Sequence, residues 1–280
     1  MSGPNPGARR CVARLPQIRA AMLVLLSPAK DLAAATPQGL EGLTTPALLE
    51  RAEPLAAKLR SLSARKLADL MELSPKLAEL NRARYQAWAT PFTAANARPA
   101  VFAFNGEAYR GFDPRSLDAA DLRFAQRHLR ILSGLYGVLR PLDLIQDYRL
   151  MMGTPLSVGR SKDLYAYWGD RISDQLRSDL AAAGTSVVVN LASSEYFKAA
   201  RAERLGARII TPVFKDRTPQ GYRMVMVFAK HQRGAMARHI VRHRLLDPEA
   251  LKRYDGDGYR FAPEESTGDM WVFLRERKPA

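Results

Sequence analysis

The sequence has little cysteine and no long hydrophobic run, and both absences narrow the class of protein. Cys11 is the only cysteine among 280 residues, which excludes an intramolecular disulfide and a cysteine-ligated metal site. The longest uninterrupted apolar run covers residues 20–26, far short of the roughly 20 residues that a membrane-spanning helix needs. We therefore expect no transmembrane helix, no membrane partner and a reducing compartment.

Several nucleotide and hydrolase motifs are also missing. The chain has no Walker A string, no Gly-x-Gly-x-x-Gly and no Gly-x-Ser-x-Gly. These absences disfavour a P-loop NTPase, a standard Rossmann dehydrogenase and a standard α/β-hydrolase. We assign no catalytic residue, cofactor or metal, and the sequence leaves open whether the protein is an enzyme and which oligomer it forms.

Acidic residues are scarce relative to basic ones. The chain has 43 Lys and Arg against 28 Asp and Glu, a formal net charge of +15. Residues 1–21 contain four arginines and no acid, so their removal leaves 39 − 28 = +11. A basic surface attracts polyanions such as nucleic acid. The alternative is a solubilising surface with no specific partner.

Hydrophobic patterns predict a mixed α/β fold in one compact domain over residues 22–280, with a mixed β-sheet wrapped by helices. Residues 1–21 are predicted to be a flexible basic extension. Continuous apolar runs at 22–26 and 186–191 predict buried strands. Further strands are predicted at 100–104, 207–214, 222–229, 258–262 and 270–275, and helices at 45–90, 163–182 and 230–245.

Six strings occur in a characteristic order along the chain. They are LLSPAK at 25–30, FTAANAR at 92–98, HLRILSGLYGVLRPLD at 128–143, KDLY at 162–165, NLASSEYFK at 190–198 and KHQRGAMAR at 230–238. Together they resemble the YaaA family of peroxide-stress proteins over nearly all of residues 22–275. The family usually begins at the position of Met22, so residues 1–21 depart from its pattern.

The resemblance implies a cytoplasmic protein that protects cells from hydrogen peroxide and lowers unincorporated iron. It also implies a single-domain fold peculiar to the family, and binding to double-stranded DNA through a helix-hairpin-helix-like element.

The segment 128–146 is the candidate for that element. Its Gly-Leu-Tyr-Gly sequence is predicted to form a hairpin whose N–H groups approach a phosphate. The alternative is a buried turn whose glycines only permit a left-handed backbone. The predicted DNA-binding residues are Arg130, Gly134, Leu135, Tyr136, Gly137 and Arg140.

Polar residues after two predicted strands form a second candidate site. Because ligands gather at the carboxyl ends of parallel strands, these residues predict a pocket for a nucleotide or another anionic small molecule. The alternative is that they only cap and position helices. The residues are Lys30, Asn190, Ser193, Glu195, Lys198, Lys230, Arg233 and Arg238.

The predicted 230–245 helix is strongly basic and carries His239 and His243 one turn apart. One interpretation is a track for a polyanion, and the other is a solvated helix face. The two histidines lack a third and fourth ligand in the sequence pattern, so we predict no metal site there.

Overall fold

The apolar run near the start of the chain forms strand β1 (Leu23–Leu26) at the centre of the fold. The computed structural model describes residues 21–37 and 39–276. In it, β1 pairs in parallel with β5 (Leu129–Ser133) on one side and with β8 (Val187–Leu191) on the other. All four side chains of β1 are buried. A strand between two parallel neighbours is covered on both faces, which explains its continuous apolar sequence.

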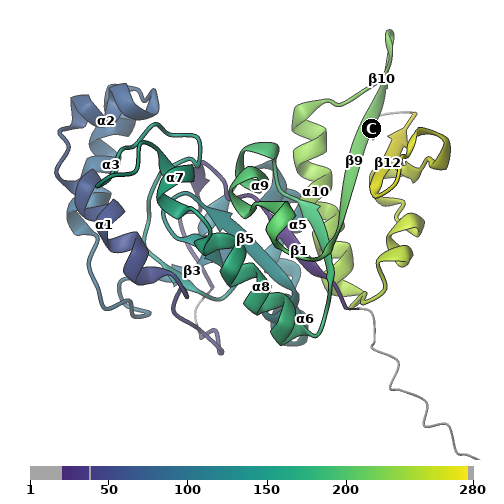
Figure 1. Cartoon of the computed structure of the whole chain (residues 1–280), viewed down its shortest axis with the longest axis horizontal. Helices are drawn as coiled ribbons and strands as arrows, with labels where there is room; N and C mark the ends of the chain where they lie inside the picture. The colour runs from purple at the N-terminus through teal and green to yellow at the C-terminus, as the bar shows by residue number, and fades with distance from the viewer. Residues whose placement is uncertain (1–20, 38, 277–280) are drawn as a thin grey trace, which may run out of the picture.

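The sheet continues on both sides of this parallel centre. Its strand order is β11-β12-β9-β8-β1-β5-β6, with β10 paired to β9. Strands β9 (Arg208–Thr218) and β12 (Met270–Arg275) extend the parallel part. The antiparallel members are β6 (Gly137–Leu139), β10 (Gly221–Arg223) and β11 (Arg260–Phe261). This mixed sheet with its helices confirms the predicted fold class (Figure 1).

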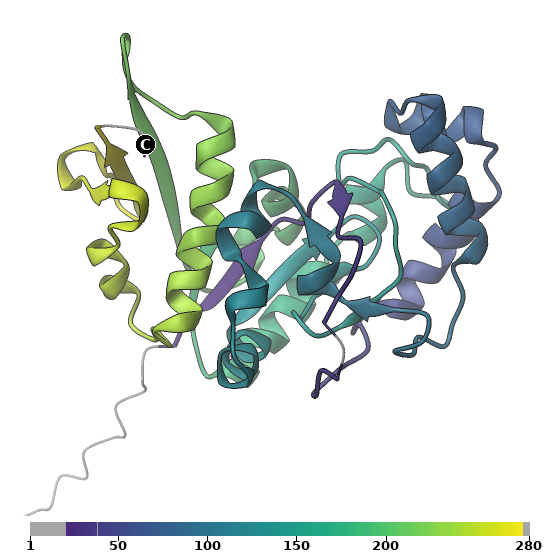
Figure 2. The same cartoon turned by 180° about the vertical axis from the view of Figure 1, so that it is seen from behind.

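Helices cover the two faces of the sheet. Helices α8 (Arg171–Ala183) and α9 (Ser194–Ala200) lie on the face toward the viewer in Figure 1. The opposite face, seen in Figure 2, is covered by α5 (Glu107–Phe112), α6 (Ala119–His128) and α10 (Met226–Arg242). The carboxyl ends of β1 and β8 thus lie between two helical layers.

Helices α5 and α10 cross at very close range because glycines stand at the crossing point. A Cβ atom on Gly234 would lie 1.7 Å from the carbonyl oxygen of Ala108, and one on Gly111 would lie 2.1 Å from that of His231. Both distances are far below van der Waals contact, so any side chain at either position must push the helices apart. The missing side chain of Gly234 is what lets the backbone of α5 approach so closely.

Three helices form a lobe at the end of the molecule away from the chain's C-terminus (Figure 1). They are α1 (Leu49–Arg60), α2 (Ala64–Met71) and α3 (Pro75–Ala87). Ser63 and Ser74 cap α2 and α3 by accepting backbone N–H bonds, as their positions predict. The hydroxyl of Tyr85 donates to the carbonyl of Arg149 at 2.6 Å, which ties the lobe to the body.

Short elements complete the chain. Two small sheets pair β2 (Asp31–Leu32) with β4 (Phe104–Asn105), and β3 (Arg98–Pro99) with β7 (Leu144–Ile145). The remaining helices are α4 (Ala100–Ala103), α7 (Leu164–Trp168) and five 3₁₀ turns at Pro114–Ser116, Ala202–Arg204, Pro248–Arg253, Gly256–Gly258 and Pro263–Glu265.

Three local predictions were wrong. Residues 100–103 form helix α4 rather than a strand, since a short buried apolar run fits either structure. The predicted strand at 222–229 ends at Arg223, and its second half begins α10. The predicted helix at 163–182 is broken at Gly169, whose φ of 52° lies in the left-handed region.

A buried ion pair fixes the base of the long strand β9. Arg275 on β12 donates from Nε to Asp216 on β9 at 2.8 Å, and the hydroxyl of Tyr259 donates to the same carboxylate at 2.9 Å. Both charged side chains are about as buried as the apolar core. Beyond this point β9 continues only with β10, and the two strands project from the sheet (Figure 1).

Within the described residues, none of the helices is long and apolar enough to cross a membrane. The predicted basic extension at 1–21 lies, apart from Ala21, outside those residues.

Candidate nucleic-acid interface

The segment predicted to be a helix-hairpin-helix is a buried β-hairpin. Residues 134–136 connect β5 to β6, and the side chains of Leu135 and Tyr136 are fully buried. A Cβ atom on Gly134 would lie 2.3 Å from the carbonyl oxygen of Leu150, so this glycine admits the crossing chain rather than a phosphate. The prediction of an exposed phosphate-binding hairpin at 134–137 is therefore wrong.

Tyr136 fills the inside of this hairpin. Its hydroxyl accepts a hydrogen bond from Nε1 of Trp88 at 3.0 Å and donates to the carbonyl of Gln146 at 3.2 Å. Burial raises the pKa of this phenol far above its usual range. The side chain is a core residue with satisfied polar groups, and it is not available to a sugar or base.

The two arginines beside the hairpin already have carboxylate partners. Arg130 is buried and bonds Asp179 through two parallel N–H groups, Nε to Oδ2 at 2.7 Å and Nη2 to Oδ1 at 3.0 Å. Arg140 bonds Asp143 from Nε at 3.2 Å, and burial raises the pKa of Asp143 in spite of this partner. The buried Arg130 guanidinium cannot bind a phosphate without breaking its ion pair, whereas Arg140 is partly exposed and its Nη1 group has no partner in the described residues.

The residues predicted to meet at the carboxyl ends of β1 and β8 do so, but only a few of them are in contact. Because β1 and β8 are parallel neighbours, the residues that follow them meet. The backbone N–H of Ser193 donates to Oγ of Ser27 at 2.8 Å, and the two serine oxygens lie 3.3 Å apart. Ser27 is the partner that the sequence prediction left out.

The other predicted residues of this cluster hold the local structure. The Asn190 side chain accepts from the backbone of Ala192 at 3.1 Å. Glu195 accepts from the N–H of Gly153 at 2.9 Å. Lys198 lies over the ring of Tyr165, 4.7 Å from its centre. These contacts match the capping alternative. Among the predicted residues that follow β1 and β8, only the exposed Lys30 has no side-chain partner within 21–37 and 39–276.

The strongest charge feature lies in β10 and α10. Residues 217–246 contain seven Lys or Arg and no Asp or Glu. The C-terminal half of α10 is neutralised by other elements, since Arg238 faces Asp113 at 3.5 Å and both Arg242 and Arg244 face Asp121. The unneutralised charge is therefore concentrated at residues 217–233, which we call the basic arm.

The basic arm carries four cations without a carboxylate partner in the described part of the chain. Arg217 stacks on Tyr222, with its guanidinium 5.2 Å from the ring centre, and Tyr222 in turn donates to Glu276. Arg223 and Lys230 are exposed. Arg233 is half-buried, and burial alone lowers its pKa because no acid lies nearby to offset the lost hydration.

The start of α10 adds to this positive field. The helix begins without a side-chain cap and without an acid in its first turn, so its dipole is uncompensated there. Met224, Met226 and Val227 are exposed at the same place. The arm thus combines cations, a helix dipole and an apolar surface.

His239 of α10 packs against His243, the residue that follows the helix, and against the buried Tyr254. The ring centres of the two histidines are 4.5 Å apart, and burial together with His243 lowers the pKa of His239. Across 21–37 and 39–276, no group of three or more His, Cys, Asp or Glu side chains is arranged to hold a metal ion.

Comparisons with known proteins agree with the strings found in the sequence. The family model described as peroxide stress protein YaaA matches residues 22–265. A UPF0246 protein of Cupriavidus pinatubonensis is 51% identical over 257 residues, covering 91% of this chain and 98% of that protein. A UPF0246 protein of Neisseria meningitidis serogroup B is 46% identical over 257 residues, covering 92% and 99%. With a family match over most of its length and relatives of this similarity, the chain belongs to the YaaA family of peroxide stress proteins.

Proposed function

We propose that the protein binds double-stranded DNA without strong sequence preference, through the basic arm. We further propose that this binding helps to limit oxidative damage and free iron during peroxide stress. The observation that carries the proposal is the set of unpaired cations, Arg217, Arg223, Lys230 and Arg233, in a segment without acids. Cations that have no internal partner are available to phosphates, and phosphate contacts bring affinity without reading sequence.

The shape and composition of the arm also support DNA as the partner. The β9–β10 ribbon projects from the body (Figure 1), and a two-stranded ribbon fits a DNA groove. Met224 and Met226 are exposed beside the cations. Apolar side chains beside basic ones are a common feature of proteins that lie in the minor groove.

The helix pair α2–α3 is the alternative interface. It is joined by the short turn 72–74 and carries the exposed cations Arg65, Lys66 and Lys76. However, Asp69, Glu72 and Glu79 alternate with those cations and are also exposed. Mixed charge gives a weaker field than a segment of one sign, so we place the interface on the arm.

A salt titration of DNA binding tests this assignment. Binding of a fluorescent duplex is measured by anisotropy at several salt concentrations for the wild type and for the triple variant Arg223→Gln, Lys230→Gln, Arg233→Gln. We expect the triple variant to bind on the order of 100-fold more weakly at low salt, and its salt slope to fall by about 3, because each cation releases about one counterion. Two duplexes of unrelated sequence should bind alike.

The matched control is the triple variant Arg65→Gln, Lys66→Gln, Lys76→Gln, which removes the same charge from α2–α3. It should retain wild-type affinity and slope. Loss of binding in the control alone moves the interface to the helix pair. Binding by the wild type that does not change between low and moderate salt refutes a phosphate-based interface altogether.

A further inference from the structure

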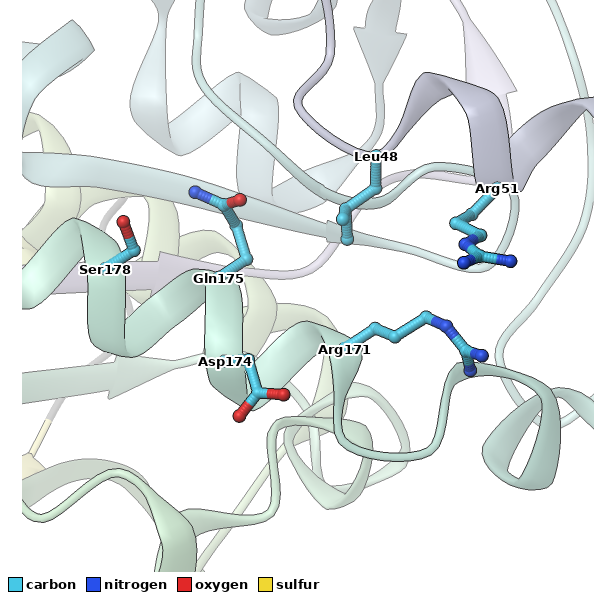
Figure 3. A pocket seen from close by; sticks show the side chains of 6 residues that line it. All are labelled: Leu48, Arg51, Arg171, Asp174, Gln175 and Ser178. Carbon is cyan, nitrogen blue, oxygen red and sulfur yellow. The ribbon is translucent and has the colours of Figure 1, made fainter.

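A groove lined by polar, charged and apolar side chains lies away from the basic arm. It lies between the start of α1 and the first turns of α8, and its volume is about 350 Å³ (Figure 3). That volume falls within the range of small-molecule sites in proteins, about 300–1,000 Å³. The lining residues are Leu48, Arg51, Arg171, Asp174, Gln175 and Ser178.

Two arginines stand at one end of the groove and come from different elements. In Figure 3 the guanidinium groups of Arg51 and Arg171 are both drawn at that end, and both residues line the groove. The Arg51 guanidinium has no hydrogen bond or ion pair in the part of the chain that the structure describes. Arg171 donates from Nη1 to the carbonyls of Tyr167 at 2.7 Å and Trp168 at 3.4 Å, and its other N–H groups have no partner there. The pair therefore offers unused donors to an anion.

The backbone around these arginines is held in place. The hydroxyl of Tyr167 donates to the carbonyl of Arg51 at 2.7 Å, which links α1 to α7. Because Arg171 is bonded to the carbonyl of the same Tyr167, both arginines are tied to one residue. The Arg171 guanidinium and the backbone of Arg51 are thus held before an anion binds, which reduces the entropy lost on binding.

The start of α8 contributes a positive field of its own. Asp170 occupies the N-cap position but makes no side-chain cap bond, because its carboxylate is bonded to Arg201 and faces Arg204 at 3.2 Å. The helix dipole at this end is therefore uncompensated by its cap. Arg171, the first residue of α8, lines the groove and adds its charge to the dipole, while Asp174 in the same first turn offsets part of that positive field.

The rest of the groove is suited to the uncharged part of a ligand. Leu48 supplies an apolar contact, and Gln175 and Ser178 supply hydrogen-bonding groups from α8. Asp174 is the one acid of the lining and faces Arg177 at 3.7 Å; its carboxylate is drawn on the side of α8 away from Gln175 (Figure 3). Two cations at one end, with polar and apolar groups beyond them, match a phosphate attached to a sugar and a base.

We propose that this groove binds a small phosphate monoester of the size of a mononucleotide, with its phosphate between Arg51 and Arg171. Paired guanidinium groups bind phosphate oxygens with favourable geometry as well as charge. The groove lies on the face of the sheet that α8 covers. The basic arm includes the first turns of α10, which covers the other face (Figures 1 and 2). The proposal is therefore independent of DNA binding by the arm.

Calorimetric titration of the full chain tests the site, with adenosine 5′-monophosphate, inorganic phosphate and adenosine as separate probes. We expect the monophosphate to bind most tightly, inorganic phosphate more weakly, and adenosine not measurably. Arg51→Gln and Arg171→Gln should each weaken monophosphate binding about tenfold or more, since each removes a charge-assisted contact. Lys58→Gln, which removes an exposed cation from the same helix as Arg51, should have no effect.

The outcomes separate the proposal from its rivals. Equal binding of the monophosphate to the wild type and to both arginine variants overturns the site. So does the absence of monophosphate binding, even if duplex DNA binds and the arginine variants weaken that binding, because the groove would then be a contact for the DNA backbone. Unchanged unfolding midpoints of the two exposed-arginine variants confirm that a lost affinity reflects the site and not the fold.

Discussion

The hairpin at 130–140 and the basic arm at 217–233 both place arginines beside a tight β-turn, yet the surroundings of those arginines differ completely. Arg130 is buried and doubly bonded to Asp179, whereas Arg223 is exposed and has no partner in the described residues. A sequence shows the two arginines as equivalent charges. The structure shows that the availability of an arginine depends on the carboxylates that distant segments bring to it.

This contrast is tested most strongly by removing the partner of the buried arginine. Asp179→Ala leaves the Arg130 guanidinium buried without a counter-charge, and we expect a loss of about 3–5 kcal/mol in the free energy of unfolding. Urea denaturation measures it. Asp174→Ala on the same helix removes an exposed carboxylate and should change stability by less than about 1 kcal/mol. If the two variants were equally stable, the hairpin arginine would be as free as those of the arm.

The same tyrosine substitution should have different effects in the two regions. Tyr136→Phe removes a buried hydroxyl that joins Trp88 to Gln146, and should cost about 1–2 kcal/mol because those groups lose their partner. Tyr222→Phe in the arm removes a hydroxyl that water can replace. Its unfolding midpoint should match the wild type, and a larger loss at Tyr222 than at Tyr136 would contradict the contrast.

The smallest effect distinguishes paired from unpaired cations within α10 itself. Arg238 faces Asp113 at 3.5 Å on a partly exposed surface, whereas Arg233 has no acid nearby. Arg238→Gln should weaken DNA binding by less than about twofold, and Arg233→Gln by about fivefold, because only the unpaired cation can fully neutralise a phosphate and displace its counterion from the DNA. Anisotropy at one low salt concentration decides it, and the reverse order would mean that pairing does not control binding.

Local signals in the sequence were enough for much of the fold. The β-branched run of β8, the serine caps of α2 and α3, and the limits of β12 follow from side-chain chemistry within a few residues. The apolar runs predicted β1 and β8 as buried strands, whereas their parallel pairing was a condition of the predicted pocket and was not itself predicted. The prediction was wrong where an apolar run was too short to distinguish a strand from a helix. Residues 100–103 are such a run, since four apolar residues suit a strand or a turn of helix equally.

The candidate sites were harder because their decisive contacts are long-range. Asp179 lies 49 residues from Arg130, and Leu150, which crosses Gly134, belongs to another loop. Neither contact can be inferred from the residues next to the hairpin in sequence. The hairpin sequence was therefore interpreted as a phosphate-binding turn. By contrast, the absence of acids over residues 217–246 is visible in the sequence, and that signal could have placed the candidate interface at the arm from the start.

The buried ion pair between Asp216 and Arg275 marks the point at which β9 leaves the main sheet. From there it projects, supported at one end only. Residues 211–216 of β9 are paired with β12, and the residues beyond Asp216 are paired only with β10. Any force on the projecting strands is transmitted to β9 at Asp216. There the buried ion pair with Arg275 holds β9 in register with β12. Because the tip beyond Asp216 is paired with no strand of the sheet other than β10, a change in its length is expected to leave the pairing of β9 with β12 undisturbed.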